Sequence, residues 1–507
     1  MGAGKCGDIE AMIGLPSISF SQQSRSTRCA FVIALFLLAG IPRVMAALLL
    51  PNEEGDPYSY FRAIQMMRAA LVGGTFTITE LFGFWLPLYQ FVCASISAVV
   101  GDPLHVAKLV SAVCGTGVCL LVFYASLRLT SSFGLAFLSF ALIAFNPIHV
   151  MYSGFSMSDV PHALLVMGGL VCAMAGHWVL AAVLIAGGGL MRPESWAFIP
   201  LVPMLQWLLQ RRVTLIPIVV ALVSPALWIY ISWLATGNPF EYFKVRSEYI
   251  KELVSQSPSL GHFSIAGVII DLRTLFYSSG PAVVISCMIA AFWLVKRLRD
   301  RAMTKALDSV SEAVVVTLYF FSSLAFLLFA YFTKNQPAIF ARYCLVLFAL
   351  GLPVLAWILS TTKNWPRSRA VALWTLLLSL CVLQVGFQIR DSRVFINQVS
   401  QKRLVADYLT NNISATTEAK VFCDDDTVKI LAGIPAGNFL SSADSPVDTR
   451  SFLNYLKENH VEFLVWEKRD QSVPINLFAE LGDDGIENQF ELVAATNTDL
   501  RVYRVSF

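Results

Sequence analysis

The sequence is poor in charged residues. Only 14% of its 507 residues are charged, whereas 56% are hydrophobic, and soluble domains usually carry about 25% charged residues. A single soluble core cannot bury so much apolar surface, so the chain needs the bilayer as its solvent. The net charge is only +3, which excludes the strongly basic surface of a nucleic-acid-binding protein.

Three kinds of motif are also missing. The ten cysteines form no CxxC pair or Cys/His cluster, which excludes a recognisable zinc site or disulfide framework. No glycine-rich loop follows a predicted strand, so a nucleotide-sugar donor is not supported. No internal repeat is visible, and this counts against a transporter built from inverted repeats.

Long apolar runs are abundant in the first 390 residues. The first run follows a polar segment, 1–28, and has about 22 residues, enough to span a hydrocarbon core of about 30 Å. We predict about eleven membrane spans, with residues 1–28 as a cytoplasmic tail. The predicted spans are Cys29–Leu50, His105–Arg128, Phe133–Tyr152, Pro161–Ala175, Trp178–Leu190, Ser195–Leu209, Val213–Leu234, Leu275–Val295, Ala313–Phe332, Phe340–Leu359 and Ala370–Phe387.

One further run, Phe84 to Val100, decides the orientation of everything that follows it. If it does not span, three basic clusters share the cytoplasmic side with the N-terminus, as the positive-inside rule requires. The clusters are Arg211–Arg212, Lys296–Lys305 and Lys363–Arg369. We therefore expect Leu81–Val100 to be an interfacial or re-entrant segment of a long first outer loop, residues 51–104. The pair Trp178–Leu190 and Ser195–Leu209 is interpreted as two spans around a break.

The end of the chain has a different composition. Residues 390–507 are charged and rich in turn residues, with predicted strands at Val461–Val465 and Leu500–Phe507 and a predicted helix at Arg450–Asn459. Asn497–Asp499 is typical of a turn between strands. The acidic run Asp424-Asp425-Asp426 is more typical of a solvated turn than of a metal site.

The predicted fold class is therefore mainly α. It is a polytopic transmembrane helical bundle, residues 29–389, with a small soluble α/β domain at residues 390–507 on the extracytoplasmic side. The positive-inside count places the candidate site loops on that same side.

Carboxylates near two predicted helix starts are candidate bases. Glu54 and Asp56 lie in the first outer loop, and Asp159 lies in a short outer turn. A carboxylate at the membrane surface can accept a proton from an attacking hydroxyl. The alternative is helix capping, by Asp56 ahead of a proline or by Ser158 or Asp159. His149, in the same turn, is interpreted as a packed polar residue.

Arginines stand at two other positions near the predicted membrane surface. Arg192 and Glu194 lie at the break in the short helix pair, where such groups need partners or an aqueous cavity. Arg342 precedes a predicted span and is suited to a bidentate phosphate contact. The alternatives are a structural Arg192–Glu194 pair and snorkelling of Arg342 to lipid headgroups. Lys244 and Arg246, in the large outer loop, are only weak phosphate candidates.

The order of these motifs resembles the GT-C superfamily of membrane glycosyltransferases, especially the branch with protein O-mannosyltransferases and lipid A aminoarabinose transferases. The resemblance covers roughly residues 28 to 400. The residues that carry it are Glu54, Asp56, Tyr58, Tyr60, Trp85 to Tyr89, Pro147, Tyr152 to Asp159, Arg192 to Glu194, and Arg342-Tyr343.

The resemblance implies an inverting transferase that uses a sugar on a polyprenyl phosphate. By this resemblance Asp56 is the base, with Glu54 as its alternative because Gly55 separates the two acids. Asp159 is the second acid. Arg342, Arg192 and Tyr343 are expected to bind the donor phosphate. The residues expected to contact substrate are Tyr58, Tyr60, Tyr89 and Glu194.

The resemblance leaves other features open. The sugar, hexose-type or pentose, and the acceptor hydroxyl, on a protein, lipid or glycan, are not specified. Some members of the superfamily use a divalent metal and others do not. The expected location is the plasma membrane if the protein is bacterial. The competing hypothesis is a polytopic transporter or flippase of lipid-linked or small substrates.

Overall fold

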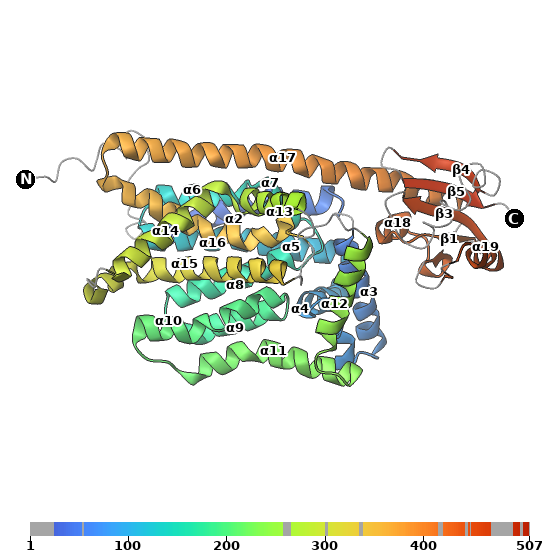
Figure 1. Ribbon diagram of the computed structural model, residues 1–507, viewed down its shortest axis with the longest axis horizontal. Coiled ribbons are helices and arrows are strands. Elements are labelled where there is room, and N and C mark those ends of the chain that lie inside the picture. The colour runs from blue at the N-terminus through green and yellow to red at the C-terminus, as the bar shows by residue number, and fades with distance from the viewer. Residues whose placement is uncertain are drawn as a thin grey trace, which may run out of the picture. The chain divides into compact units, whose positions relative to one another are not determined.

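The computed structural model describes most of the chain, and its helices and strands are labelled in Figure 1. The described ranges are 25–52, 55–256, 265–299, 303–333, 338–413, 419–441, 445–446, 448–467, 490–496 and 500–505. The chain divides into two compact units. We call Met1–Leu50 with Ala63–Arg390 the membrane unit, and Pro51–Arg62 with Asp391–Phe507 the C-terminal unit.

Six helices within the described ranges are long and apolar enough to cross a membrane. They are α2 (Arg25–Leu49), α5 (Pro103–Thr130), α11 (Leu215–Thr236), α15 (Met303–Phe332), α16 (Leu345–Thr361) and α17 (Arg367–Asn412). Two bent pairs raise the number to eight if each pair is one span. These are α6 (Phe133–Ala144) with α7 (Pro147–Ser153), bent by 61°, and α13 (Ile265–Ser279) with α14 (Pro281–Arg299), bent by 86°. The chain is thus a multi-pass membrane protein.

The predicted count of about eleven spans is not confirmed. The difference lies in α8 (Asp159–Met174), α9 (Trp178–Gly189) and α10 (Leu201–Gln210), which have 16, 12 and 10 residues. At about 1.5 Å per residue, none of them reaches the roughly 30 Å of a hydrocarbon core. The break predicted after α9 is present, because the short 3₁₀ helix η3 (Pro193–Phe198) separates α9 from α10.

The segment 51–104, predicted as the first outer loop, also contains regular structure. Its elements are α3 (Asp56–Gly73), the 3₁₀ turn η2 (Ile78–Leu81) and α4 (Leu88–Val100). With 13 residues, α4 is about 20 Å long and too short to span. Its first residue, Leu88, donates its backbone N–H to the carbonyl of Leu190 at 3.0 Å, so α4 is tied to the end of α9.

Local capping explains where two helices of the membrane unit begin. Asp102 precedes Pro103, and its carboxylate accepts the N–H of Leu104 at 2.8 Å. Asn146 precedes Pro147, and its side-chain oxygen accepts the N–H of His149 at 2.9 Å. Such caps stabilise a helix by about 1 kcal/mol each and satisfy donors that the first turn leaves unpaired.

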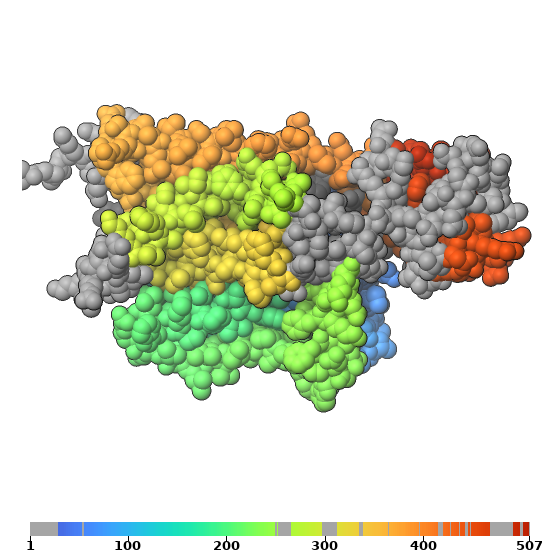
Figure 2. Space-filling view, viewed as in Figure 1, coloured from blue at the N-terminus to red at the C-terminus, as the bar shows by residue number. Residues whose placement is uncertain are grey.

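Helix α16 forms the centre of the membrane unit. Every side chain from Leu345 to Leu359 is buried, and the helix contacts α5, α6, α8, α14 and α15. Figure 2 shows α15 lying between α14 and the helices α9 to α11 on one face of this bundle. The outer helices expose large apolar side chains, such as Phe292 at 75% and Val382 at 72%. A soluble protein rarely shows so much apolar surface, whereas lipid tails solvate it.

A buried arginine fixes the bend between α6 and α7. Arg43 of α2 is fully buried and donates to the carbonyls of Ile143 and Ala144 at 3.0 and 3.1 Å. These carbonyls belong to the last turn of α6 and the residue that ends it, where the regular helical hydrogen bonds stop. Arg43 also contacts Nδ1 of His149 at 2.9 Å. His149 is therefore a packed polar residue, as predicted.

The C-terminal unit contains a five-stranded sheet in the order β2-β1-β3-β5-β4. The strands are β1 (Lys420–Phe422), β2 (Phe439–Leu440), β3 (Val461–Glu467), β4 (Phe490–Ala495) and β5 (Leu500–Val505). β1 pairs in parallel with β2 and β3, whereas β5 is antiparallel to β3 and β4. The predicted α/β domain is confirmed, and the predicted turn Asn497–Asp499 lies outside the described residues.

Helices cover both faces of this sheet. Alternate strand residues point to opposite faces, so Phe463 packs with Leu409 of α17, and Phe422 packs with Phe452 of α19 (Thr449–Glu458) on the other face. The short helix α18 (Asp426–Ala432) follows β1, and Asp425 caps it by accepting the N–H of Val428 at 2.9 Å. Asp425 therefore has a structural role in the acidic run.

Candidate active site

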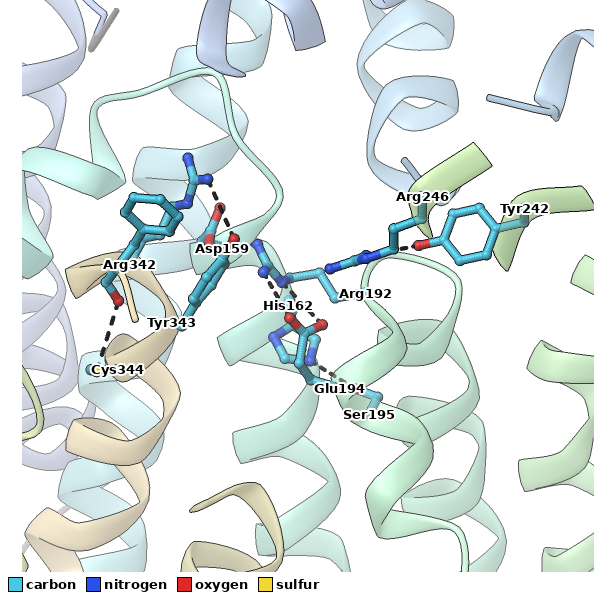
Figure 3. A network of polar contacts seen from close by, with 11 residues as sticks. Asp159, His162, Arg192, Glu194, Ser195, Tyr242, Arg246, Arg342, Tyr343 and Cys344 are labelled. Carbon is cyan, nitrogen blue, oxygen red and sulfur yellow. Dashed lines mark hydrogen bonds and ion pairs between the residues drawn. The ribbon is translucent and has the colours of Figure 1, made fainter. Parts of the chain in front are cut away.

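Arg192 joins two carboxylates in the membrane unit (Figure 3). Its Nη1 donates to Oδ1 of Asp159 at 2.5 Å, and its Nη2 donates to Oε1 of Glu194 at 2.8 Å. Its Nε also donates to Oε2 of Glu194 at 3.3 Å. Asp159 is 2% exposed and Glu194 is 15% exposed. The predicted Arg192–Glu194 pair is thus one half of a bridge that also holds Asp159.

Asp159 lies in the first turn of α8, and its carboxylate accepts a hydrogen bond from Arg192. Ser158 stands at the N-cap position, but its side chain makes no capping hydrogen bond. One turn along α8, Nε2 of His162 and Oγ of Ser195 lie 2.8 Å apart. Two polar contacts therefore connect the start of α8 to η3.

Glycines at the end of α9 make room for η3. A Cβ atom on Gly188 would lie 2.5 Å from Oγ of Ser195, and one on Gly189 would lie 2.8 Å from the ring of Trp196. Real Cβ contacts are essentially never this short, so a side chain at either glycine would displace η3. Gly188 and Gly189 therefore let the chain fold back and present Arg192 and Glu194 to Asp159.

A third segment brings a second arginine and aromatic rings. Residues Ala341–Cys344 form the 3₁₀ turn η5 at the start of α16. The guanidinium carbon of Arg192 lies 5.0 Å from the ring centre of Tyr343, and that of Arg342 lies 5.2 Å from the same ring. Arg342 also donates to the Tyr343 hydroxyl at 3.4 Å. The ring thus lies between two cations, a favourable arrangement for its electron-rich faces.

A third arginine, which the sequence analysis ranked only as a weak candidate, comes from α12 (Glu241–Gln256). Nη1 of Arg246 donates to the hydroxyl of Tyr242 at 3.0 Å, and Figure 3 shows Arg246 reaching toward Arg192. Burial acts to lower the pKa of Arg246, but Tyr242, Tyr343 and Glu194 together raise it. The available signal was the Tyr242–Arg246 spacing of four residues, which puts both side chains on one helix face.

Among the residues that the structure describes, this cluster has three arginines and two carboxylates. It contains Arg192, Arg246 and Arg342 against Asp159 and Glu194. Burial acts to raise the pKa of Glu194, but the charge and hydrogen bonds of Arg192 lower it to about 2, so this carboxylate is ionised at neutral pH. The Oδ2 atom of Asp159 accepts no hydrogen bond from any residue that the structure describes. Oδ2 of Asp159 can therefore accept one more hydrogen bond.

Comparison with known proteins identifies the fold. A scan of protein families and a search of curated proteins find no match to the sequence. Among solved structures, ArnT from Cupriavidus metallidurans in the apo state matches with a TM-score of 0.55 and 13% identity, over 95% of this chain and 98% of that one. The chain has the ArnT fold. ArnT bound to undecaprenyl phosphate matches with a TM-score of 0.54 and 11% identity over the same shares. The predicted likeness to the GT-C superfamily is confirmed as a fold.

Within this ArnT fold, five of the predicted site residues come together. They are Asp159, Arg192, Glu194, Arg342 and Tyr343. Tyr89 lies elsewhere in the membrane unit, fully buried, and its hydroxyl contacts the carbonyl of Ala107 at 3.0 Å and Oγ of Ser111 at 3.1 Å. Its hydroxyl therefore takes part in the packing of α4 against α5.

The remaining predicted residues belong to the C-terminal unit. Asp56 is the first residue of α3 and is half-buried, whereas Tyr58 and Tyr60 are each 2% exposed. Glu54 lies outside the described residues. Neither tyrosine offers its ring to solvent, so their predicted role as substrate contacts stays a prediction.

No metal site is visible in the described part of the chain. No three His, Cys, Asp or Glu side chains there lie close enough together to hold a metal ion. The two carboxylates of the cluster, Asp159 and Glu194, are both paired with Arg192.

Proposed function

We propose that this protein is an inverting membrane glycosyltransferase. It moves a hexose-type sugar from a polyprenyl-phosphate donor to an acceptor hydroxyl on the extracytoplasmic face. The observation that carries the proposal is the convergence of Arg192, Arg246 and Arg342 on one cluster, at the ends of helices in a multi-pass protein. The fold supports it, because ArnT has been solved with undecaprenyl phosphate bound.

The donor phosphate is assigned to the three arginines. The guanidinium groups of Arg342 and Arg246 can each make a bidentate contact with phosphate oxygens. Arg192 adds a third positive charge to the cluster. A departing lipid phosphate needs charge stabilisation more than it needs a proton. The same cluster would thus bind the donor and stabilise the leaving group.

In the proposed step the acceptor oxygen attacks the anomeric carbon as the bond from that carbon to the phosphate oxygen breaks. The electron pair leaves with the polyprenyl phosphate. The proton of the acceptor hydroxyl goes to the carboxylate of Asp56, and attack from the opposite side inverts the anomeric centre. Asp159 would accept a hydrogen bond from a substrate hydroxyl through Oδ2.

Binding of undecaprenyl phosphate to the purified protein tests the anion site separately from catalysis. We expect Arg342→Ala and Arg246→Ala each to weaken binding by about 10-fold or more, the scale of one charge-assisted hydrogen bond. Arg212→Ala is the matched control, because Arg212 is exposed in the segment between α10 and α11. Equal affinity in all three variants would contradict the assignment of the cluster to phosphate.

Turnover of polyprenyl-phosphate-hexose, with release of polyprenyl phosphate as readout, tests the reaction. Loss of turnover in Asp56→Asn at equal expression would support Asp56 as the base. Turnover in Asp56→Asn that disappears in Glu54→Gln would move the base to Glu54. Movement of lipid-linked sugar across vesicles without a covalent product would favour the flippase instead.

A further inference from the structure

The segment that carries Asp56 packs with the C-terminal sheet domain. Pro51–Arg62 clusters with Asp391–Phe507 in one compact unit. The backbone N–H of Gly55 donates to Oγ1 of Thr427 at 3.3 Å, and Thr427 is only 1% exposed. Gly55 has φ of +82°, a left-handed conformation that glycine adopts without strain. The residue next to the candidate base is therefore held by a buried hydroxyl.

The contact between Gly55 and Thr427 lies near the carboxyl end of β1, where the order of the strands reverses. Thr427 belongs to the first turn of α18, directly after the carboxyl end of β1. In the order β2-β1-β3, the chain goes from β1 to β2 on one side and then returns to β3 on the other side. Open parallel sheets bind ligands at such a point, where the order of strands reverses. Here Gly55 reaches this edge of the sheet.

A buried ion pair stabilises the start of α18, the helix that carries Thr427. Nζ of Lys402 on α17 pairs with Oδ2 of Asp425, whose Oδ1 caps α18. Burial and the charge of Asp425 raise the pKa of Tyr58, whereas Arg403 and Lys402 act to lower it. Asp425 thus fixes the start of α18, and α18 presents Thr427 to Gly55.

We propose that the C-terminal unit is a positioning domain for the catalytic base. Thr427 and the Lys402–Asp425 pair hold the Gly55–Tyr58 turn, and this turn sets the direction of the Asp56 carboxylate. The proposal rests on the proposed function, since it treats Asp56 as the base. Thr427, Lys402 and Asp425 are positioning residues that act through the backbone of Gly55.

Thr427→Val tests the contact in the full-length protein, because valine keeps the shape of threonine and removes the hydroxyl. Thr449→Val is the matched control, since Oγ1 of Thr449 in the same unit bonds to no described residue. We expect Thr427→Val to lower kcat for polyprenyl-phosphate-hexose by about tenfold, the scale of a small misplacement of a reacting group. The donor KM should not change. Thr427→Ser, which restores the hydroxyl, should recover kcat.

Hydrogen–deuterium exchange of the peptide containing residues 55–62 gives a readout that does not depend on turnover. We expect faster exchange in Thr427→Val and wild-type exchange in Thr449→Val. Unchanged exchange in Thr427→Val would overturn the docking contact. Faster exchange with unchanged kcat would overturn the positioning role.

The two proposals fail in different ways. An active Asp56→Asn variant would remove Asp56 as the base and with it the positioning proposal, even if the exchange result showed the docking contact. A raised donor KM in Thr427→Val, with unchanged kcat, would also overturn the proposal, because the C-terminal unit would then act on donor binding. An inactive Asp56→Asn variant with kcat lost in Thr427→Val supports both.

Discussion

Two charged clusters, one in each unit, are built differently. In the membrane unit, Arg192 bridges Asp159 and Glu194, two further arginines stand nearby, and one oxygen of Asp159 accepts no hydrogen bond from the described residues. In the C-terminal unit, Lys402 and Asp425 balance each other, and both oxygens of Asp425 have donors. Buried polar groups in a purely structural cluster are normally satisfied. The two clusters therefore differ in the number of arginines near their carboxylates and in how the carboxylate oxygens are used.

Removal of Arg192 should give the largest effect. Arg192→Ala leaves Asp159 and Glu194 buried without their shared cation, and breaking a buried ion pair costs about 3–5 kcal/mol of stability. We expect undecaprenyl-phosphate binding to fall by more than about 100-fold, and Arg192→Lys to recover part of it by restoring the charge without the fork. Titration with the lipid phosphate, beside Arg212→Ala, measures this. Tight binding by Arg192→Ala would mean that this cluster is also purely structural.

Removal of Lys402 should destabilise without affecting the lipid site. Lys402→Met leaves Asp425 without its cation, and we expect the C-terminal unit to lose about 2 kcal/mol. The measurement is hydrogen exchange in β1 and α18, combined with undecaprenyl-phosphate affinity. Unchanged undecaprenyl-phosphate affinity would show that the Lys402–Asp425 pair takes no part in lipid binding. A loss as large as that in Arg192→Ala would show that the two clusters do not differ in this respect.

A methyl group at the end of α9 should have a smaller effect. Gly189→Ala places Cβ 2.8 Å from the ring of Trp196, so η3 must shift and carry Arg192 and Glu194 with it. We expect about a tenfold loss of undecaprenyl-phosphate affinity, or about 1.4 kcal/mol. Gly187→Ala is the control, since its Cβ meets no atom closer than 3.4 Å. Equal affinities for the two variants would show that η3 adapts.

The smallest expected effect is a change in acid stability. The pKa of Glu194 is about 2 in the folded protein, below its usual value of 4.5. Its contribution to stability is therefore complete above about pH 5 and is lost as the pH falls from there toward 2. Between about pH 5 and pH 3.5 the loss is about 1 kcal/mol. Thermal unfolding should show this loss in wild type and in the exposed-site control Glu80→Gln, and little of it in Glu194→Gln.

The sequence predicted much of the fold, but its count of about eleven spans is not confirmed. Apolar runs identify helices because lipid requires every backbone group to be bonded within its own helix. The same runs do not report where a helix stops inside a protein core. Helices α8, α9 and α10 pack against α15, α11 and α16, and they have only 16, 12 and 10 residues.

Five predicted site residues converge because each lies at a helix end near a break, and such positions are visible in the sequence. Asp159, Arg192 and Arg342 follow this rule. Arg246 does not, because its outer loop is nearly neutral in charge and only the fold brings α12 to the cluster. The sequence also could not decide whether Asp159 caps α8 or binds an arginine. A capping carboxylate and an arginine-bound one have the same local sequence pattern.

The sequence by itself determined that this protein needs a bilayer, that its last 120 residues or so form a separate α/β domain, and which charges lie near helix ends. These properties follow from composition and from periodicity along the chain. The tertiary structure alone decided that Arg192 bridges two acids, that Arg246 joins them, and that the segment of Asp56 packs with the C-terminal sheet. Such contacts join residues far apart in the chain, and their energy depends on distance and burial in three dimensions.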